Sequence, residues 1–414
     1  MNNQNEHFIG LDIGTSAVRC VVGMIDPHGG NTPSIIGHGV APNQGMRRGA
    51  VVHVDDVADA IVKAVTEAER ISGMPIKHAT VNVNGSHVTG INSEGVIAIS
   101  TANREITPED RLRVEEAATI VSLPANREIV QFFAKNYSLD GQRNIKDPVG
   151  MHGVRLEVDA HIVTAASPNM RNLDQALEKA EISPTHHTVS GLAAAEAVMT
   201  RQQREAGTVL LDIGAGTTNL IVFEDGEVQH VAVLPIGGQH LTNDLAIGLK
   251  TDIDIAEKVK LEHASLKEGI KKSTATVKIG NKTHNFDFEE VAMVTEARIE
   301  ELLEYVNKEL QRIKRAGKLP GGVVLTGGTA KLPGLDEFAR EKLQLPARVG
   351  KLRGIGGLAD TVEDESFATV VGLMLLDMLL LPSLPPMHGG GLSGLKNGQG
   401  ARAILDGFLG RFKR

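Results

Sequence analysis

The feature that most constrains this chain is a strand–turn–strand unit that occurs twice, with equivalent aspartates at positions 12 and 212. In each copy an apolar strand ends in Asp-Ile-Gly and a turn of small and hydroxyl-bearing residues follows. A second β-branched strand then comes at 17–23 or 219–223. Two ordinary hairpins without a common role are the alternative. Because the copies match in register, we expect a duplicated fold that clasps one ligand between the two copies.

The residues of the two turns suit a phosphate chain. Small side chains let backbone amides approach phosphate oxygens, and hydroxyl groups add hydrogen-bond donors. An aspartate at the strand end can hold Mg²⁺ through water, because Mg²⁺ keeps most of its hydration shell. The predicted phosphate site, with Asp12 and Asp212 as the metal candidates, consists of Asp12, Gly14, Thr15, Ser16, Asp212, Gly214, Ala215, Gly216, Thr217, Thr218 and Asn219.

A third glycine-rich junction follows the second hairpin along the chain. Residues 322–326 form an apolar stretch that runs into Gly327 and Gly328. Paired glycines leave room for a flat base against the backbone. Alone, this pattern is a common strand-to-helix junction. After two phosphate hairpins, it predicts the adenosine end of a nucleotide site.

In this order and at these separations, the three elements resemble the nucleotide motifs of the actin-like ATPase superfamily. Within it, residues 128–166 are similar to the FtsA family of bacterial cell-division proteins, above all the run Asn-Ile-Lys-Asp-Pro-Val-Gly-Met-His-Gly-Val-Arg-Leu at 144–156. The resemblance covers nearly the whole chain, from Phe8 to the last residues. It implies an α/β, actin-like fold with two lobes, and ATP and Mg²⁺ as cofactors.

The layout of the family, carried onto this chain, predicts six parts. They are subdomain 1A (7–83, 163–204 and 358–382), the family's own insertion 1C (84–162), subdomain 2A (205–247 and 316–357), subdomain 2B (248–315), a flexible linker (383–400) and a C-terminal amphipathic helix (401–414). In this layout the nucleotide lies between subdomains 1A and 2A, which carry one hairpin each.

Three positions depart from the commonest superfamily pattern. Ala215 stands where the second turn usually has Gly, and Asn219 where an Asp is common. Gly191 stands where relatives that hydrolyse ATP efficiently place a Gln or Glu to orient the attacking water. Glu196, five residues on, is expected to face elsewhere. Since positioning water is a large part of phosphoryl-transfer catalysis, we expect ATP binding with weak hydrolysis at most, and we assign no catalytic residue.

Two charged residues are candidates for contact with the nucleoside. The helix expected around 255–260 has an Ala-Glu pattern that resembles the corresponding helix of the superfamily. This resemblance implies that Glu257 and Lys260 contact the ribose and base. The alternative is a solvated, charged helix face.

Arg298 is the candidate for partner binding. The resemblance places it on a helix around 296–303, where FtsA-like proteins bind the C-terminal peptide of the tubulin-like protein FtsZ. The alternative is an ordinary surface arginine with Glu301 and Glu304 nearby. The resemblance further implies that the chain polymerises with itself and that other division proteins are partners.

The C-terminal end has the composition of a linker followed by an amphipathic helix. Residues 383–400 hold six Gly and two Pro, which is typical of a flexible linker. In 401–414 the apolar residues recur on one helical face with basic residues around it. This pattern predicts an interfacial helix on anionic phospholipid, and the alternative is a helix that docks on this protein or a partner. The residues expected at the membrane are Ile404, Leu405, Phe408, Leu409, Phe412, Arg402, Arg411, Lys413 and Arg414.

The composition restricts the classes of partner and the cellular location that we expect. The net charge is −8 and the chain has no Trp and two Tyr, which argues against a nucleic-acid binder. Residues 1–7 lack the features of a signal peptide, which favours the cytoplasm. The single cysteine, Cys20, lies in a strand-like run and is expected to be a buried, inert thiol, with a nucleophile as the alternative. The apolar run 367–381 is shorter than the ~20 residues that span a bilayer and predicts a buried helix.

The resemblance and the tail together predict a peripheral protein on the cytoplasmic face of the inner membrane at the division site. It would bind ATP, polymerise on the membrane and anchor FtsZ filaments. The main alternative is a small-molecule kinase or chaperone-type ATPase on the same fold, which would need an acceptor site or a substrate domain after the ATPase. An actin-like pilus-assembly ATPase fits the nucleotide motifs but not the membrane-active tail.

Overall fold

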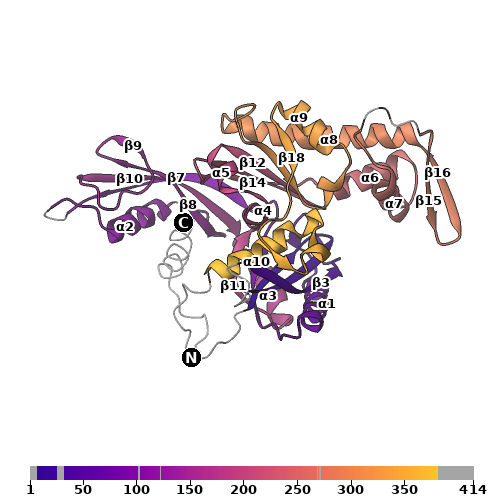
Figure 1. Cartoon of the computed structure of the whole chain (residues 1–414), viewed down its shortest axis with the longest axis horizontal. Helices are drawn as coiled ribbons and strands as arrows, with labels where there is room; N and C mark the ends of the chain where they lie inside the picture. Colours follow the sequence, from indigo (N-terminus) through magenta and orange to yellow (C-terminus); the bar gives the residue numbers. More distant parts are fainter. Residues whose placement is uncertain are drawn as a thin grey trace.

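The computed structural model describes residues 7–25, 32–100, 103–121, 123–267, 269 and 272–380. The predicted linker at 383–400 and the predicted membrane helix at 401–414, with every side chain assigned to it, lie outside the described residues. The described part has two lobes, with an insertion extending from one end and a smaller subdomain at the other (Figure 1).

Within the described residues, lobe 1 is built on a mixed sheet of six strands. Their order is β11 (Ser183–Val189), β6 (His78–Val83), β1 (His7–Ile13), β2 (Ala17–Ile25), β3 (Pro33–Pro42) and β19 (Gly356–Gly357). The other elements of lobe 1 are the hairpin β4 (Met46–Arg47) and β5 (Ala50–Val51) and helices α1 (Val54–Ser72), α3 (Ser167–Lys179), α4 (Ser190–Val198) and α10 (Ala368–Leu380). Helix α10 packs closely on β1 because Gly10 has no side chain: a Cβ there would lie 2.2 Å from the carbonyl oxygen of Val370.

In the described chain, lobe 2 and the insertion share a sheet of nine strands. Their order is β18 (Ala347–Val349), β17 (Gly322–Thr326), β12 (Thr208–Ile213), β13 (Thr218–Glu224), β14 (Glu227–Leu234), β7 (Thr89–Ala98), β10 (Arg155–Ala166), β8 (Arg127–Leu139) and β9 (Gln142–Ile145). Strands β7 to β10, with α2 (Pro108–Thr119), form the insertion. Helix α5 (Arg201–Glu205) leads into lobe 2, and α8 (Phe288–Arg312) and α9 (Leu335–Leu343) cover one face of its sheet.

The smaller subdomain has a hydrophobic core of its own, built by α6, α7, the β15–β16 ribbon and the start of α8. The bounds of these elements are α6 (Gly238–Gly248), α7 (Ile253–His263), β15 (Thr274–Ile279) and β16 (Lys282–Asp287). Asp287 caps α8, because its carboxylate accepts the amide of Glu289 at 2.9 Å. Helix α8 then runs on into lobe 2 and connects the two cores.

The two predicted hairpins have the same geometry. β1 pairs antiparallel with β2, and β12 with β13, so Asp12 lies opposite Arg19 and Asp212 opposite Asn219. In each turn the glycine after Asp-Ile donates its amide to a carbonyl three residues on, at 3.1 Å in the first copy and 2.9 Å in the second. The sequence match therefore corresponds to a structural duplication.

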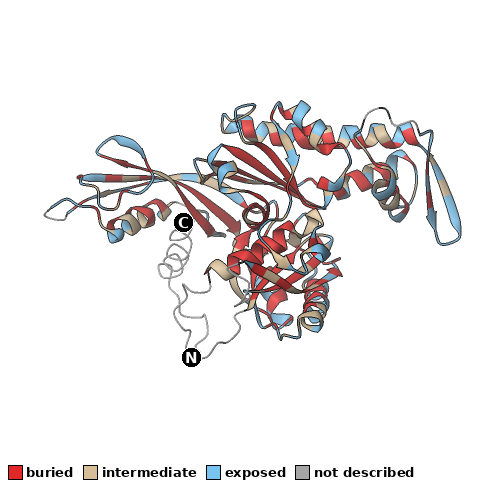
Figure 2. Ribbon diagram, in the orientation of Figure 1, coloured by how far each residue is buried: buried red, intermediate tan, exposed pale blue. Residues whose placement is uncertain are grey.

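Burial agrees with two predictions from the sequence. Cys20 is fully buried in β2, and burial raises the pKa of its thiol to about 12, as expected of an inert thiol. The apolar run forms the mostly buried α10, and buried residues, red in Figure 2, run through both sheets. Among the helices of the described residues, none is long and apolar enough to cross a membrane.

Candidate functional site

A cavity of about 790 Å³ lies between the two lobes, where the turns of both hairpins meet. Its volume is within the ~300–1,000 Å³ range of small-molecule sites. Both hairpins, the glycine pair after β17 and helix α7 contribute to its wall. The predicted nucleotide residues that line it are Asp12, Gly14, Thr15, Ser16, Asp212, Gly214, Ala215, Thr217, Asn219, Glu257, Lys260, Gly327 and Gly328.

Two predicted residues, Gly216 and Thr218, are not among the lining residues. Thr218 is fully buried, and its hydroxyl donates to the carbonyl of Ile236 at 2.8 Å. Thr218 begins β13 and faces away from the cavity, whereas Thr217, in the turn just before β13, lines it. Gly216 meets the first hairpin, since a Cβ there would lie 2.9 Å from Thr15 Oγ1. These two residues hold the second turn in position.

Asp12 is held at the floor of the cavity by a residue that the sequence did not identify. Asn82, in β6, donates to Asp12 Oδ1 at 2.7 Å and to Ser190 Oγ at 3.1 Å. Burial raises the pKa of Asp12 to about 7, while Arg19 lowers it and Asp212 raises it. No local motif marks Asn82, because it reaches Asp12 through the parallel pairing of β1 and β6.

Asp212 is the counterpart of Asp12 in lobe 2. Its Oδ2 accepts the side-chain amide of Asn219 at 3.0 Å and the hydroxyl of Thr369, in α10, at 3.3 Å. Burial raises the pKa of Asp212, and these two hydrogen bonds lower it. Asn219 therefore supplies a donor to Asp212 where an aspartate would add a second negative charge.

The donor set fits Mg²⁺. Among the described residues, no cluster of three or more His, Cys, Asp and Glu is placed to hold a metal. At the hairpin end of the cavity the carboxylates are those of Asp12 and Asp212, whereas Asp254, Glu257 and Glu262 line it from α7. A hydrated Mg²⁺ needs few protein ligands, and its charge would offset the cost of two buried carboxylates. Asn219 Oδ1, buried and without a hydrogen-bond partner in the described part of the chain, is a free acceptor beside them.

Arg19 also lines the cavity and was missed. It lies opposite Asp12 in the hairpin register, and its guanidinium sits 5.5 Å from the ring centroid of Phe367. Within the described structure its Nε is buried without a hydrogen-bond partner. Arg19 thus adds a cation to the wall of a cavity suited to phosphate. The hairpin register was the signal that would have found Arg19, since residues 12 and 19 are cross-strand neighbours.

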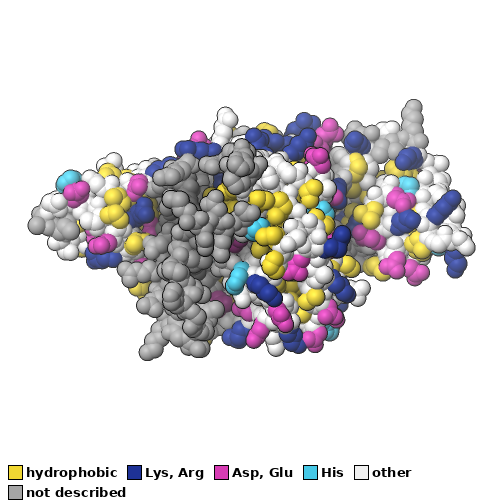
Figure 3. Space-filling view, turned by 60° about the horizontal axis from the view of Figure 1, so that its bottom comes forward, with side chains coloured by type: hydrophobic (Ala, Val, Ile, Leu, Met, Phe, Trp, Pro, Cys, Tyr) yellow, Lys and Arg dark blue, Asp and Glu magenta, His cyan; other side chains and the backbone are white. Residues whose placement is uncertain are grey.

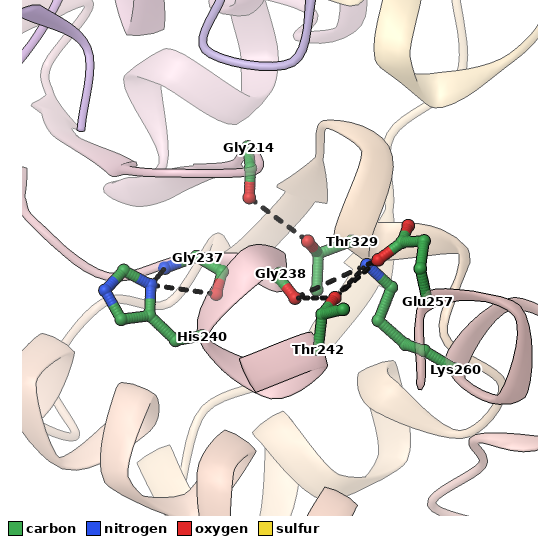
Figure 4. A network of polar contacts seen from close by, with 8 residues as sticks. All are labelled: Gly214, Gly237, Gly238, His240, Thr242, Glu257, Lys260 and Thr329. Atoms are coloured by element: carbon green, nitrogen blue, oxygen red, sulfur yellow. Dashed lines mark hydrogen bonds and ion pairs between the residues drawn. The ribbon is translucent and has the colours of Figure 1, made fainter. Parts of the chain in front are cut away.

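At the other end of the cavity, Glu257 and Lys260 form a polar network (Figure 4). Lys260 Nζ lies 2.7 Å from Glu257 Oε2 and 2.9 Å from Thr242 Oγ1. The neighbouring wall is apolar and open, because Ile253 is 50% exposed and Leu261 73% exposed although both line the cavity. A polar network beside an exposed apolar rim suits a ribose and a flat base.

The glycine pair closes this side of the site. Gly327 has a φ of 84°, and a Cβ there would lie 2.5 Å from Asp212 Oδ1. Its amide donates to the carbonyl of Glu365 at 3.1 Å, which ties β17 to the segment that returns to lobe 1. Any side chain at position 327 would therefore strain the backbone and push against the floor of the cavity.

Neither Gly191 nor Glu196 offers a side chain to the cavity. A Cβ at Gly191 would lie 3.1 Å from Asn219 Cβ and from a side-chain carbon of Ile221, so the position is packed against β13. Glu196 turns away and pairs with Arg204 at 2.8 Å. The structure therefore places Glu196 as expected, and no carboxylate or amide from α4 faces the cavity.

Arg298 is engaged within its own chain. Its guanidinium contacts Asp244 in α6 and Glu301 one turn along α8, and its side chain is 21% exposed. The hydrogen bond that Arg298 donates to the carboxylate of Asp244 is the main cause that raises the pKa of Arg298. The pairing with Glu301 is the one that the alternative interpretation anticipated, whereas Glu304 pairs with Lys308.

Comparison with known proteins decides the family. The model of the cell division protein FtsA matches residues 209–372, and that of the SHS2 domain inserted in FtsA matches 85–164. The cell division protein FtsA of Pseudomonas aeruginosa is 35% identical over 89% of this chain and 88% of that protein. That of Bacillus subtilis is 39% identical over 90% and 83%. The chain belongs to the FtsA family.

Membership of the FtsA family confirms the resemblance inferred from the motifs, and the SHS2 domain matches the predicted insertion. Solved structures confirm the actin-like fold. They are the PilM–PilN type IV pilus biogenesis complex (TM-score 0.64, 18% identity, 89% of this chain and 98% of that), MreB5 of Spiroplasma citri bound to ADP (0.55, 14%, 90% and 96%) and the MamK double helical filament (0.51, 15%, 90% and 99%). At these identities they show the fold alone.

Proposed function

We propose that this FtsA-family chain binds Mg-ATP between its lobes, polymerises on the cytoplasmic face of the cell membrane and anchors FtsZ filaments at the division site. The observation that carries the nucleotide part is the cavity between two equivalent hairpins, each with a buried aspartate. MreB5, which shares the fold, has been solved with ADP. ATP is thus proposed as the ligand that the two lobes enclose.

Different residues of the chain would bind the different parts of the nucleotide. The amides of the two turns and the hydroxyls of Thr15, Ser16 and Thr217 would bind the phosphates. Asp12 and Asp212 would hold hydrated Mg²⁺, which neutralises the phosphate charge. Glu257 and Lys260 would bind the ribose, with the base against the glycine pair and the apolar rim. The chain is proposed as a nucleotide-dependent polymer and adaptor, with weak ATPase activity at most.

Replacing Gly327 with Asp tests the pocket. The new carboxylate would lie against Asp212 and repel the phosphates of the nucleotide. Two like charges about 4 Å apart at an effective dielectric constant of ~20 repel by ~4 kcal/mol, so the affinity for Mg-ATP should fall by ~100-fold or more. Gly317→Asp is the matched control, because Gly317 also has a positive φ, 64°, and a Cβ there meets nothing within 4 Å. Wild-type affinity of Gly327→Asp in calorimetric titration would reject the pocket assignment.

The contact between α6 and α8 in the smaller subdomain supports the proposed FtsZ site. Gly248 and Val294 pack together, and their chain neighbours Ile247 and Met293 are 77% and 65% exposed. Arg298 joins the same two helices through Asp244, so this surface carries exposed apolar side chains and charged groups, both of which a short amphipathic peptide uses. The C-terminal peptide of FtsZ is the proposed occupant.

Polymerisation and membrane binding are proposed together. A fold neighbour, MamK, forms a double helical filament, and a filament would place many C-terminal helices on one surface. Where coloured side chains are visible in Figure 3, basic and acidic residues are interspersed. Attraction to anionic lipid is assigned to the basic C-terminal segment, at about 1 kcal/mol for each basic residue near the leaflet.

A further inference from the structure

The insertion is bonded to both lobes. Its chain leaves lobe 1 after β6 and returns to it before α3. Its sheet nevertheless continues into lobe 2, because β7 lies beside β14 (Figure 1). Among the described residues, a single pair in register, Thr89 and Ala232, joins these two strands. We call this short junction the seam. Side-chain contacts supply much of the bonding across it.

His161, in β10 of the insertion, reaches across the seam. It is 1% exposed, and its Nε2 accepts the amide hydrogen of Val231, in β14, at 3.0 Å. Its Nδ1 therefore carries the ring hydrogen and donates to Asn92 Oδ1 at 2.8 Å. Gly90 makes this reach possible, because a Cβ there would lie 2.3 Å from His161 Nε2 and 2.6 Å from the carbonyl oxygen of Val231.

Two further contacts hold the insertion to lobe 2. The ring of His230, in β14, packs edge-on against His161 with centroids 5.4 Å apart, and its Nε2 lies 3.2 Å from Glu309 Oε2 in α8. Just after β9, Lys146 Nζ donates to the carbonyl of Asp225 in the β13–β14 turn. The insertion therefore meets lobe 2 at two separate places.

Buried contacts also hold the insertion to lobe 1, at the ends of its strands that lie nearest that lobe. The amide of Val189, in β11, donates to Gln131 Oε1 in β8 at 3.1 Å, and both groups are buried. Val130 and Val163 of the insertion pack in a hydrophobic core that contains the strands of lobe 1 and also Val228 and Val231 of β14. A change of angle between the lobes must therefore either break the seam or deform the insertion.

We propose that the insertion is a brace: it fastens lobe 2 to lobe 1 through the His161 seam and limits the range of angles that the lobes adopt. This inference goes beyond the proposed function and holds whether or not the cavity binds ATP. Its physical basis is that an element with buried bonds to two bodies restricts their relative motion. A partner that displaces the insertion would then change the angle between the lobes and the width of the cavity between them.

Distances between spin labels test the brace in the nucleotide-free full chain. Labels at Asp59→Cys (α1) and Lys318→Cys (after α8) report the lobe–lobe distance, and the exposed Glu109→Cys (α2) with Lys318→Cys reports the distance from insertion to lobe 2. Cys20 is fully buried and stays unlabelled. Gly90→Ala breaks the seam and should broaden both distance distributions, with loss of hydrogen-exchange protection at the amide of Val231.

Gly95→Ala is the matched control. It lies on the same strand, but its Cβ would meet the carbonyl oxygen of Val114 at 2.2 Å inside the insertion, so the lobe–lobe distribution should stay as in wild type. If Gly90→Ala fails to fold, Lys146→Ala removes the exposed second contact and should broaden the same distributions. An unchanged lobe–lobe distribution in the folded seam variant overturns the brace, and equal broadening in Gly90→Ala and Gly95→Ala overturns the seam as its cause.

Discussion

Proton release on nucleotide binding gives a sensitive test of the role of Asp12. Burial raises the pKa of Asp12 to about 7, against a lowering effect of Arg19 and with a further increase from Asp212. Near neutral pH the nucleotide-free chain therefore contains both protonated and ionised Asp12. Because metal ligands must be deprotonated, binding of Mg-ATP should expel this proton.

The number of protons follows from the pKa. With a pKa of about 7, Asp12 is ~75% protonated at pH 6.5 and ~10% at pH 8. Titration calorimetry in buffers of different ionisation enthalpy measures the protons released per nucleotide bound. Wild type should release ~0.7 more protons than Asp12→Asn at pH 6.5 and ~0.1 more at pH 8. The variant should fold, because its side-chain oxygen still accepts the hydrogen bond from Asn82.

The same pKa sets the sign of a stability change without nucleotide. The folded chain keeps the Asp12 proton after the unfolded chain has lost it, so the contribution of Asp12 to stability falls as the pH rises from about 4 to about 7 and is level above that. A shift of about three units corresponds to ~4 kcal/mol. Asp12→Asn should remove this contribution and leave those of Asp212 and Asp377, whose pKa values are also raised by burial. Equal proton release by wild type and Asp12→Asn, or no decrease between pH 6.5 and 8, would refute the reasoning.

Three further predictions concern turnover, the partner and the membrane. ATP turnover in a phosphate-release assay should lie well below the ~1–100 s⁻¹ of kinases, because Gly191 gives the cavity no side chain to orient water; a rate in that range contradicts this. Arg298→Glu should weaken binding of the FtsZ peptide in fluorescence polarisation and spare ATP binding, with Lys308→Glu on the same helix as the control. If Arg298→Glu binds normally, Arg298 serves its intramolecular ion pairs alone. Truncation after Gly400, and Phe408→Asp, should leave the protein in the supernatant with anionic liposomes, and a truncated chain that pellets like wild type would exclude the tail as anchor.

Most features that depend on neighbouring residues could be predicted from the sequence, with Arg19 as an exception. The two Asp-Ile-Gly turns, the strands around them and the glycine pair after β17 are local patterns, because turn geometry and strand alternation are set over a few residues. Their order along the chain was enough to infer the superfamily, and the run at 144–156 pointed to FtsA. The buried α10 and the buried Cys20 also followed from local hydrophobicity.

Only the tertiary structure decided which distant residues complete the site. Asn82 and Thr369 bind the two cavity aspartates across 70 and 157 residues of sequence, and strand pairing and helix packing set those contacts. The same holds for Arg298, whose partner Asp244 comes from another helix. The family layout groups the insertion with lobe 1 as subdomain 1C, and its chain leaves and re-enters lobe 1, yet β7 pairs with β14 of lobe 2. Chain order shows only which segments are covalently connected. An edge strand pairs with whichever strand the packed core brings beside it. No local sequence pattern determines which strand that is.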